Sequence, residues 1–126
     1  MKKVIHTEKA PKAVGPYSQA VSTGDLLFTA GQVAIDPATG KLVEGGIKEQ
    51  TRQVMENLKA ILAEAGTDFS KVVKSTVFLQ DIKSFADFNQ VYGEYFPSEP
   101  PARSTFQVGA LPLGARVEIE MIVLLR

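Results

Sequence analysis

Two residues near the end of the 126-residue chain have side chains that could bind and convert a small substrate. Arg103 lies in segment 100–105 (PPARST), and Glu118 lies in segment 115–120 (ARVEIE). A guanidinium is a planar fork of donors that suits a carboxylate. A glutamate partly removed from water can act as a general acid or base. An intrachain salt bridge of Arg103 with Glu118 or Glu120 is an equally good interpretation, so the residue types leave both open.

A few other residues could take part in a site. Tyr17 follows a Gly-Pro pair and is either an aromatic wall of a site or an ordinary core ring. Thr29 and the backbone N–H of Gly31, at the end of a short apolar run, are possible donors to a ligand. The only histidine, His6, lies near the start of the chain and fits no catalytic or metal-ligand spacing, and we interpret it as a surface residue. The sequence contains no Ser-His-Asp pattern, metal-ligand spacing or glycine-rich phosphate loop.

Composition narrows the class of protein. The chain has 14 Lys and Arg against 14 Asp and Glu, and this zero net charge disfavours a nucleic-acid partner. It has no cysteine, which excludes disulfides, thiolate metal sites and a cysteine nucleophile. No stretch approaches the ~20 apolar residues of a membrane span. We therefore expect one domain over residues 1–126, soluble and cytoplasmic, with no membrane association.

The spacing of apolar residues predicts the elements that position these side chains. An amphipathic helix is expected at 47–65, with Gly66 as the residue that ends it. A second helix is expected at 85–96, with Ser84 and Asp87 as an N-cap pair and an aromatic stripe that belongs to the core. Strands are expected at 3–6, 17–22, 26–31, 72–80, 103–108 and 115–125, with a turn at 36–40. This order indicates an α+β fold with a single mixed sheet and both helices packed on one face.

Strand alternation assigns side chains to the two faces of the sheet. Arg103 and Thr105 share a polar face of one strand, and Glu118 lies on the polar face of the next. We expect the apolar faces to lie under the helices and the polar faces to point away from them. Strands 26–31 and 72–80 are apolar on both sides, so the helix-free side needs a second cover, most simply another copy of the chain. A small cleft at that subunit boundary is the natural place for a site.

Four segments, in order and in register, resemble the RidA (YjgF) family over nearly the whole chain: 15–20 (GPYSQA), 28–32 (FTAGQ), 101–104 (PARS) and 117–120 (VEIE). The resemblance implies a chorismate-mutase-like α+β fold and a homotrimer with three clefts between subunits. It also implies a hydrolase acting on C–N bonds, a 2-iminobutanoate/2-iminopropanoate deaminase. Such an enzyme converts the enamines 2-aminoacrylate and 2-aminocrotonate, released by pyridoxal-phosphate-dependent dehydratases, to 2-keto acids and ammonia. The family uses no cofactor and no metal.

The resemblance carries roles to individual residues. Arg103 matches the arginine that binds the substrate carboxylate, and Glu118 matches the glutamate near the reacting water. Tyr17 matches the aromatic residue that lines the cleft, and Gly31 the glycine whose backbone approaches the ligand.

Three further positions belong to the expected substrate site. Thr29 and Asn89 fall at positions that resemble cleft or subunit-contact residues of the family. Thr105 stands where many similar bacterial sequences have a cysteine. This departure implies that hydrolysis requires no thiol and that thiol-based regulation is absent.

Two other functions fit parts of the pattern. A trimeric protein that binds 2-keto acids for regulation, without turnover, would use the same arginine clamp. Some relatives are associated with RNA cleavage that inhibits translation, but the balanced charge argues against this activity here.

Overall fold

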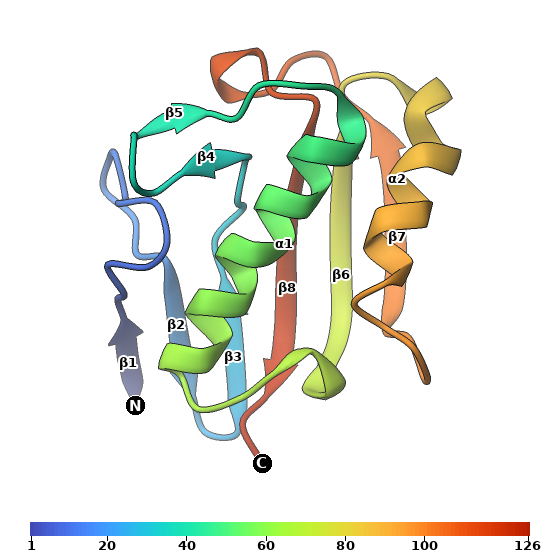
Figure 1. Ribbon diagram of the computed structural model, residues 1–126. Coiled ribbons are helices and arrows are strands. Elements are labelled where there is room, and N and C mark those ends of the chain that lie inside the picture. Colours follow the sequence, from blue (N-terminus) through green and yellow to red (C-terminus); the bar gives the residue numbers. More distant parts are fainter.

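A six-stranded sheet forms the centre of the computed structural model, which describes residues 1–126 (Figure 1). Its strand order is β1-β2-β3-β8-β6-β7. The strands are β1 (Lys2–Ile5), β2 (Ala20–Thr23), β3 (Leu26–Thr29), β6 (Val72–Leu79), β7 (Ala102–Gln107) and β8 (Val117–Leu124). All neighbours are antiparallel except β6 and β7, which are parallel because a helical crossover joins them. The sheet is therefore mixed, as predicted.

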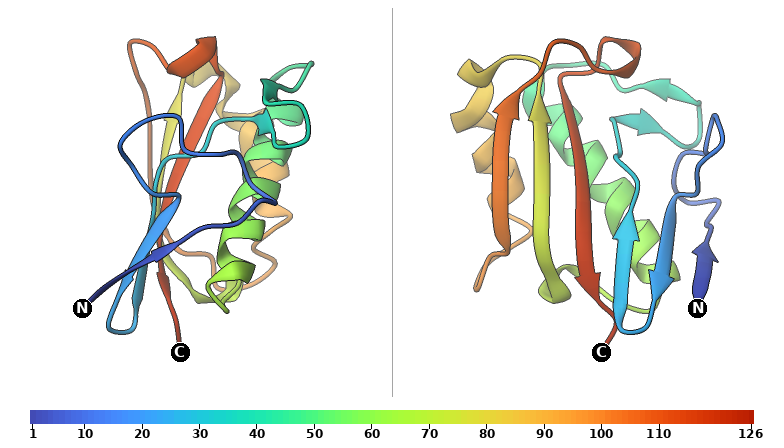
Figure 2. Two further views of the ribbon diagram at one scale, coloured as in Figure 1. Left: turned by 90° about the vertical axis from the view of Figure 1, so that its left-hand side faces the viewer. Right: turned by 180° about the vertical axis from the view of Figure 1, so that it is seen from behind.

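Two helices, α1 (Ile47–Glu64) and α2 (Phe85–Gly93), cover the same face of the sheet, as the left view of Figure 2 shows. This arrangement confirms the predicted α+β class. The prediction of a single sheet was incomplete, because β4 (Ile35–Asp36) and β5 (Lys41–Leu42) pair as a small second sheet around the predicted turn. Strands of two residues are too short to produce an alternating pattern. Neither helix is long and apolar enough to cross a membrane.

Helix α1 follows the predicted pattern closely. The Glu49 carboxylate accepts a hydrogen bond from the Gly46 backbone N–H at 2.8 Å, which satisfies a donor at the start of the helix. Gly66, at φ +82°, follows the last turn in the left-handed conformation expected of a C′ glycine. The apolar stripe between these ends is fully buried against the sheet through Val54, Met55, Leu58, Ile61 and Leu62.

Helix α2 differs from its prediction at both ends. It stops at Gly93 instead of Phe96, and the next residues continue as tight turns with i to i−3 backbone bonds. Ser84 is the N-cap, but its side chain makes no capping bond, so the predicted capping pair was wrong. A 3₁₀ turn (Ile82–Ser84), capped by the Asp81 side chain on the Lys83 N–H, leads into the helix instead.

The aromatic stripe of α2 joins the core, as predicted. Phe88, Tyr92 and Phe96 are buried, whereas Phe85 at the start of the helix remains 38% exposed. The sheet face without helices has no cover within the chain and carries the exposed side chains of Phe28, Phe106 and Leu124.

Candidate functional site

A pocket of about 650 Å³ lies where β3 ends and β8 begins, and it contains three of the predicted site residues: Tyr17, Gly31 and Glu118. Of its ten lining residues six are hydrophobic, and Glu118 is the only charged one. A single carboxylate in an otherwise apolar pocket is the arrangement expected of a site for a small molecule.

Gly31 is needed in this pocket because the Glu118 carboxylate occupies the space of a side chain. A Cβ added to Gly31 would overlap Glu118 Oε2 and lie 2.8 Å from its Cδ. Two backbone bonds fix the chain around this contact: Gln32 and Ile119 each donate to the other's carbonyl, at 2.9 and 3.2 Å. The role of the glycine is thus to make room, since its backbone is not in the left-handed region.

The carboxyl group of Glu118 has no counter-cation within the chain. No ion pair or hydrogen bond of the structure involves this side chain. Partial burial, with a smaller contribution from the neighbouring charge of Glu120, raises its pKa. A half-buried carboxylate with free acceptor oxygens can orient a water molecule or accept a proton from it.

Tyr17 forms a wall of the pocket and is not a core ring. Its side chain is 47% exposed, and its hydroxyl accepts a 3.3 Å hydrogen bond from the Val14 backbone N–H. The loop that carries Tyr17 and Val14 has no regular secondary structure, so it depends on side-chain bonds for its position.

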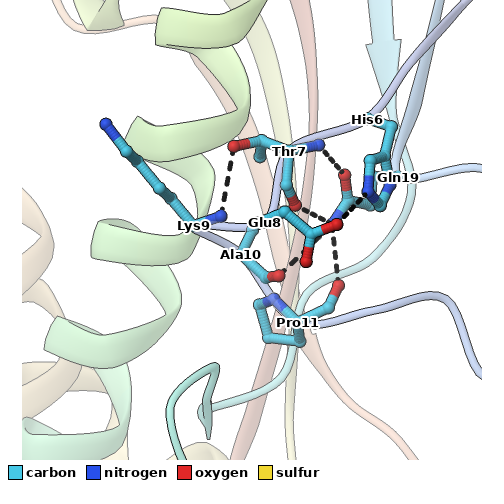
Figure 3. Close-up of polar contacts among 7 residues, drawn as sticks. All are labelled: His6, Thr7, Glu8, Lys9, Ala10, Pro11 and Gln19. Carbon is cyan, nitrogen blue, oxygen red and sulfur yellow. Dashed lines mark hydrogen bonds and ion pairs between the residues drawn. The ribbon is translucent and has the colours of Figure 1, made fainter.

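Gln19 supplies those bonds. Its amide lies among the backbone groups of residues 7–11, as Figure 3 shows, and the residue is only 2% exposed. The carbonyl oxygen accepts from the Thr7 N–H at 2.7 Å, and the NH₂ donates to the carbonyls of Thr7 and Pro11 at 3.0 and 2.8 Å. A longer contact reaches Ala10. Nearby, His6 lies on the surface beside Glu8, as expected.

Helix α1 holds two segments at or next to the pocket through two buried polar residues. The Asn57 side chain donates to the carbonyls of Val33 and Ile35 at 3.3 and 2.9 Å. The side-chain Oε1 of Gln50 accepts from the Arg116 N–H at 2.9 Å, just before β8. We did not predict either role. The sequence does contain a signal for these roles, because both amide residues fall on or beside the apolar stripe of the helix.

Arg103 lies away from this pocket, among the aromatic side chains of α2. Its Cζ is 5.3, 5.5 and 4.9 Å from the ring centroids of Phe85, Phe88 and Tyr92. The Tyr92 hydroxyl is in turn 2.6 Å from the buried Ser75 hydroxyl. Cation–π contacts hold the guanidinium without neutralising it, which leaves its donors for an anion.

The intrachain salt bridge is excluded, because Arg103 takes part in no ion pair. The expected orientation of Arg103 away from the helices was also wrong. Arg103 pairs in register with Ser75, whose side chain is fully buried beneath α2, whereas Glu118 pairs with Phe78 on the helix-free side. The two residues therefore face opposite sides of the sheet.

The remaining predicted residues, Thr105, Asn89 and Thr29, lie outside the pocket of Glu118. Thr105 shares the face of Arg103, and Asn89 lies on α2; each has a buried side-chain oxygen without a partner, Oγ1 and Oδ1 respectively. The Thr29 hydroxyl accepts from the Met121 N–H at 2.9 Å inside the sheet, and Thr29 does not line the pocket. One chain thus brings together Tyr17 and Gly31 with the carboxylate, and separates them from the arginine.

Comparison with known proteins places this chain in a family. A family model described as Endoribonuclease L-PSP matches residues 7–125. The bovine protein named 2-iminobutanoate/2-iminopropanoate deaminase is 52% identical over 122 residues, which cover 97% of this chain and 89% of that protein. The Arabidopsis thaliana protein named Reactive Intermediate Deaminase A, chloroplastic, is 49% identical over 124 residues, covering 98% of this chain and 66% of that protein.

The fold agrees with solved structures of such proteins. The crystal structure of RidA from the Antarctic bacterium Psychrobacter sp. PAMC 21119 superposes with a TM-score of 0.93 at 47% identity, covering 97% of this chain and 98% of that one. The family model and these relatives each extend over nearly the whole chain. The chain therefore belongs to the RidA (YjgF) family, whose model is described as Endoribonuclease L-PSP.

Proposed function

We propose that this protein is an imine deaminase that hydrolyses 2-iminopropanoate and 2-iminobutanoate to 2-keto acids and ammonia. The observation that carries the proposal is the half-buried Glu118 carboxylate, placed against Gly31 in an apolar pocket with no cation to neutralise it. A bovine relative with 52% identity carries the name of this activity. The substrates form from the enamines 2-aminoacrylate and 2-aminocrotonate that pyridoxal-phosphate-dependent dehydratases release.

We propose further that the site is completed between subunits of a homotrimer. Arg103 and Glu118 face opposite sides of the sheet, so one chain alone does not direct both at one small molecule. A neighbouring subunit packed on the helix-free face would cover Phe28, Phe106 and Leu124 and could bring its own Arg103 to the pocket of Glu118. The unpartnered oxygens of Thr105 and Asn89 would then lie at the same boundary.

The proposed chemistry begins with binding of the substrate carboxylate. The guanidinium of Arg103 binds it through charge-assisted hydrogen bonds worth about 1.5–3 kcal/mol. The aromatic rings around the guanidinium restrict its motion, so less conformational entropy is lost when the carboxylate binds.

Hydrolysis then takes place at the imine carbon. The enamine tautomerises to the imine, and a proton from solvent on the imine nitrogen gives the iminium ion. A water oriented by Glu118 adds its oxygen to the carbon while the carboxylate accepts one of its protons. Glu118 then returns this proton to the nitrogen of the carbinolamine and accepts the hydroxyl proton as the C=O bond forms, the C–N bond breaks and ammonia leaves. These imines already hydrolyse in water, so acid–base help of about 10²–10⁴-fold is sufficient.

The decisive experiment compares wild type with Arg103→Ala on 2-aminoacrylate generated in the assay by a dehydratase. We expect acceleration above the buffer rate for wild type and loss of it for the variant, with circular dichroism unchanged. Full activity of Arg103→Ala would refute the proposal that Arg103 binds the substrate carboxylate. A wild type that binds 2-keto acids but gives no acceleration would favour the regulatory binding protein instead.

A further inference from the structure

Leu113 and Val14 form an exposed apolar rim on the pocket that contains Glu118. Both line the pocket, and they are 68% and 84% exposed. Deeper in the same pocket, Val33 and Ile35 extend the apolar wall. No charged side chain other than Glu118 lines it. Exposed aliphatic side chains around a pocket leave apolar surface in contact with water until a ligand covers it.

The backbone at Leu113 is unfavourable for a leucine. Its φ of 59° and ψ of 18° lie in the left-handed region, where glycine and asparagine are favoured and bulky residues are rare. The side chain does not join the core, so packing of the fold does not explain the choice. What the leucine provides is an apolar group at the pocket, and this points to a role in ligand binding.

The geometry of the proposed substrate assigns a group to this wall. A planar imine carbon has three substituents: the carboxylate, the nitrogen and the side chain. If Arg103 binds the carboxylate and Glu118 holds the water, the side chain is the group left for the apolar wall. Apolar walls favour hydrocarbon over polar substituents because burying an unpaired polar group is unfavourable.

We propose that Leu113, with Val14, forms the subsite for the substrate side chain and makes the protein favour 2-imino acids with apolar side chains over those with polar ones. The proposal rests on the proposed function, since it concerns the same site. It assigns a specificity-determining residue in the 3₁₀ turn Pro112–Gly114, which joins β7 to β8 and lies outside the segments that resemble the family.

The test measures kcat/KM on three imines, generated in the assay from alanine, leucine and glutamine by an amino-acid oxidase. Wild type is compared with Leu113→Asn and Leu113→Gly, both of which suit the left-handed backbone. Ile82→Asn is the matched control, because Ile82 is an exposed aliphatic residue outside the pocket. Thermal unfolding of each variant shows that the fold persists.

For wild type, we expect the leucine-derived imine to be preferred to the glutamine-derived imine. Leu113→Asn should reduce that preference by about 10-fold, the usual effect of a few methylene contacts, and kcat/KM should fall less for the alanine-derived imine, whose methyl group makes fewer of these contacts. Leu113→Gly should lower kcat/KM most on the leucine-derived imine, and the control should match wild type. An unchanged preference, or equal losses on all three substrates, would overturn the assignment.

Failure of the proposed function gives a different result. In that case wild type accelerates none of the three imines, and the subsite is tested by calorimetry with 2-keto acids. Tighter binding of 4-methyl-2-oxopentanoate than of pyruvate, by about 10-fold and lost in Leu113→Asn, would support it. Equal affinities for the two acids in wild type would reject it.

Discussion

Glu118 combines two properties at the scale of the single residue: a half-buried carboxylate and no counter-cation. Burial disfavours the ionised form, which in the proposed mechanism is the form that accepts a proton from water. Gly31 is part of the same design, since a larger residue there would displace the carboxylate. Such residues are selected for reactivity more than for stability.

The raised pKa of Glu118 predicts the acidic limb of the pH–rate profile. As the pH falls through this pKa the carboxylate is protonated, so kcat/KM should fall with a midpoint above the ordinary value of 4.5. Burial is the larger cause and the charge of Glu120 the smaller one, so Glu120→Gln should move the midpoint to lower pH and leave it above 4.5.

The profiles of wild type, Glu120→Gln and the exposed control Glu64→Gln, measured on one imine, check this prediction. The control changes a carboxylate on the far side of α1 and should leave the midpoint in place. A midpoint that does not move in Glu120→Gln, or moves upward, would contradict the assignment of the limb to Glu118.

At the scale of the element, buried amide side chains hold irregular segments where no ladder of backbone bonds is available. From α1, Asn57 holds the pocket residues Val33 and Ile35, and Gln50 holds the backbone just before β8. Gln19 fixes the loop before β2. A side-chain amide suits this task because its oxygen can accept from a backbone N–H and its NH₂ can donate to backbone carbonyls. The site is thus positioned by the helix layer and by a loop anchor, in addition to the strands that carry its residues.

Replacement of Gln19 by leucine should destabilise the protein. The substitution keeps the volume but leaves a backbone N–H and at least two carbonyls buried without partners, at a cost of about 1–3 kcal/mol. Tyr17, two residues away, should lose its fixed position, so KM should rise as well. Urea unfolding and steady-state kinetics measure the two effects, and Gln90→Leu on the exposed face of α2 is the control. Equal stability of Gln19→Leu and the control would refute the anchoring role.

The regular elements were predictable from the sequence, and their ends were less so. The 3.6-residue repeat and Gly66 define α1 almost to the residue. Helix α2 was predicted three residues too long, because the aromatic stripe continues past Gly93 in turns of similar spacing. Periodicity detects which side chains share a face, and it responds similarly to an α-helix and to the turns that prolong it.

Alternation in β7 was predictable, but the side that faces the helices was not. From polarity, the side of β7 that carries Phe106 was predicted to face the helices, and the side that carries Arg103 was predicted to point away from them. In the structure Phe106 packs edge-on against Phe78 on the helix-free side, while the guanidinium of Arg103 lies over the rings of α2. A long arginine side chain is compatible with an aromatic surface, so polarity alone assigns such an edge strand poorly. The sequence motifs identified the candidate residues, but only the three-dimensional fold shows which of them lie close together.

At the scale of the whole molecule, the helix-free face of the sheet has no cover within the chain. Phe28, Phe106 and Leu124 are exposed on three different strands of this face. The chain has zero net charge, which does not suit a polyanion as the cover. Two further copies of the chain, related by a three-fold axis, would cover this face. Each contact would then join the helix-free side of one sheet to a different side of its neighbour.

Complementation between two inactive variants tests this arrangement directly. If each site takes Arg103 from one subunit and Glu118 from the next, a cleft formed by an Arg103→Ala subunit and a Glu118→Gln subunit can retain both groups. Unfolding and refolding an equal mixture should then restore about a quarter of the wild-type activity, because about one cleft in four receives both intact residues by chance. Each variant refolded alone should stay inactive, and light scattering should give three times 13.6 kDa, about 41 kDa. Mixtures that remain as inactive as the separate variants, although an affinity tag on one variant co-purifies the other, would mean that one subunit supplies both residues to each site.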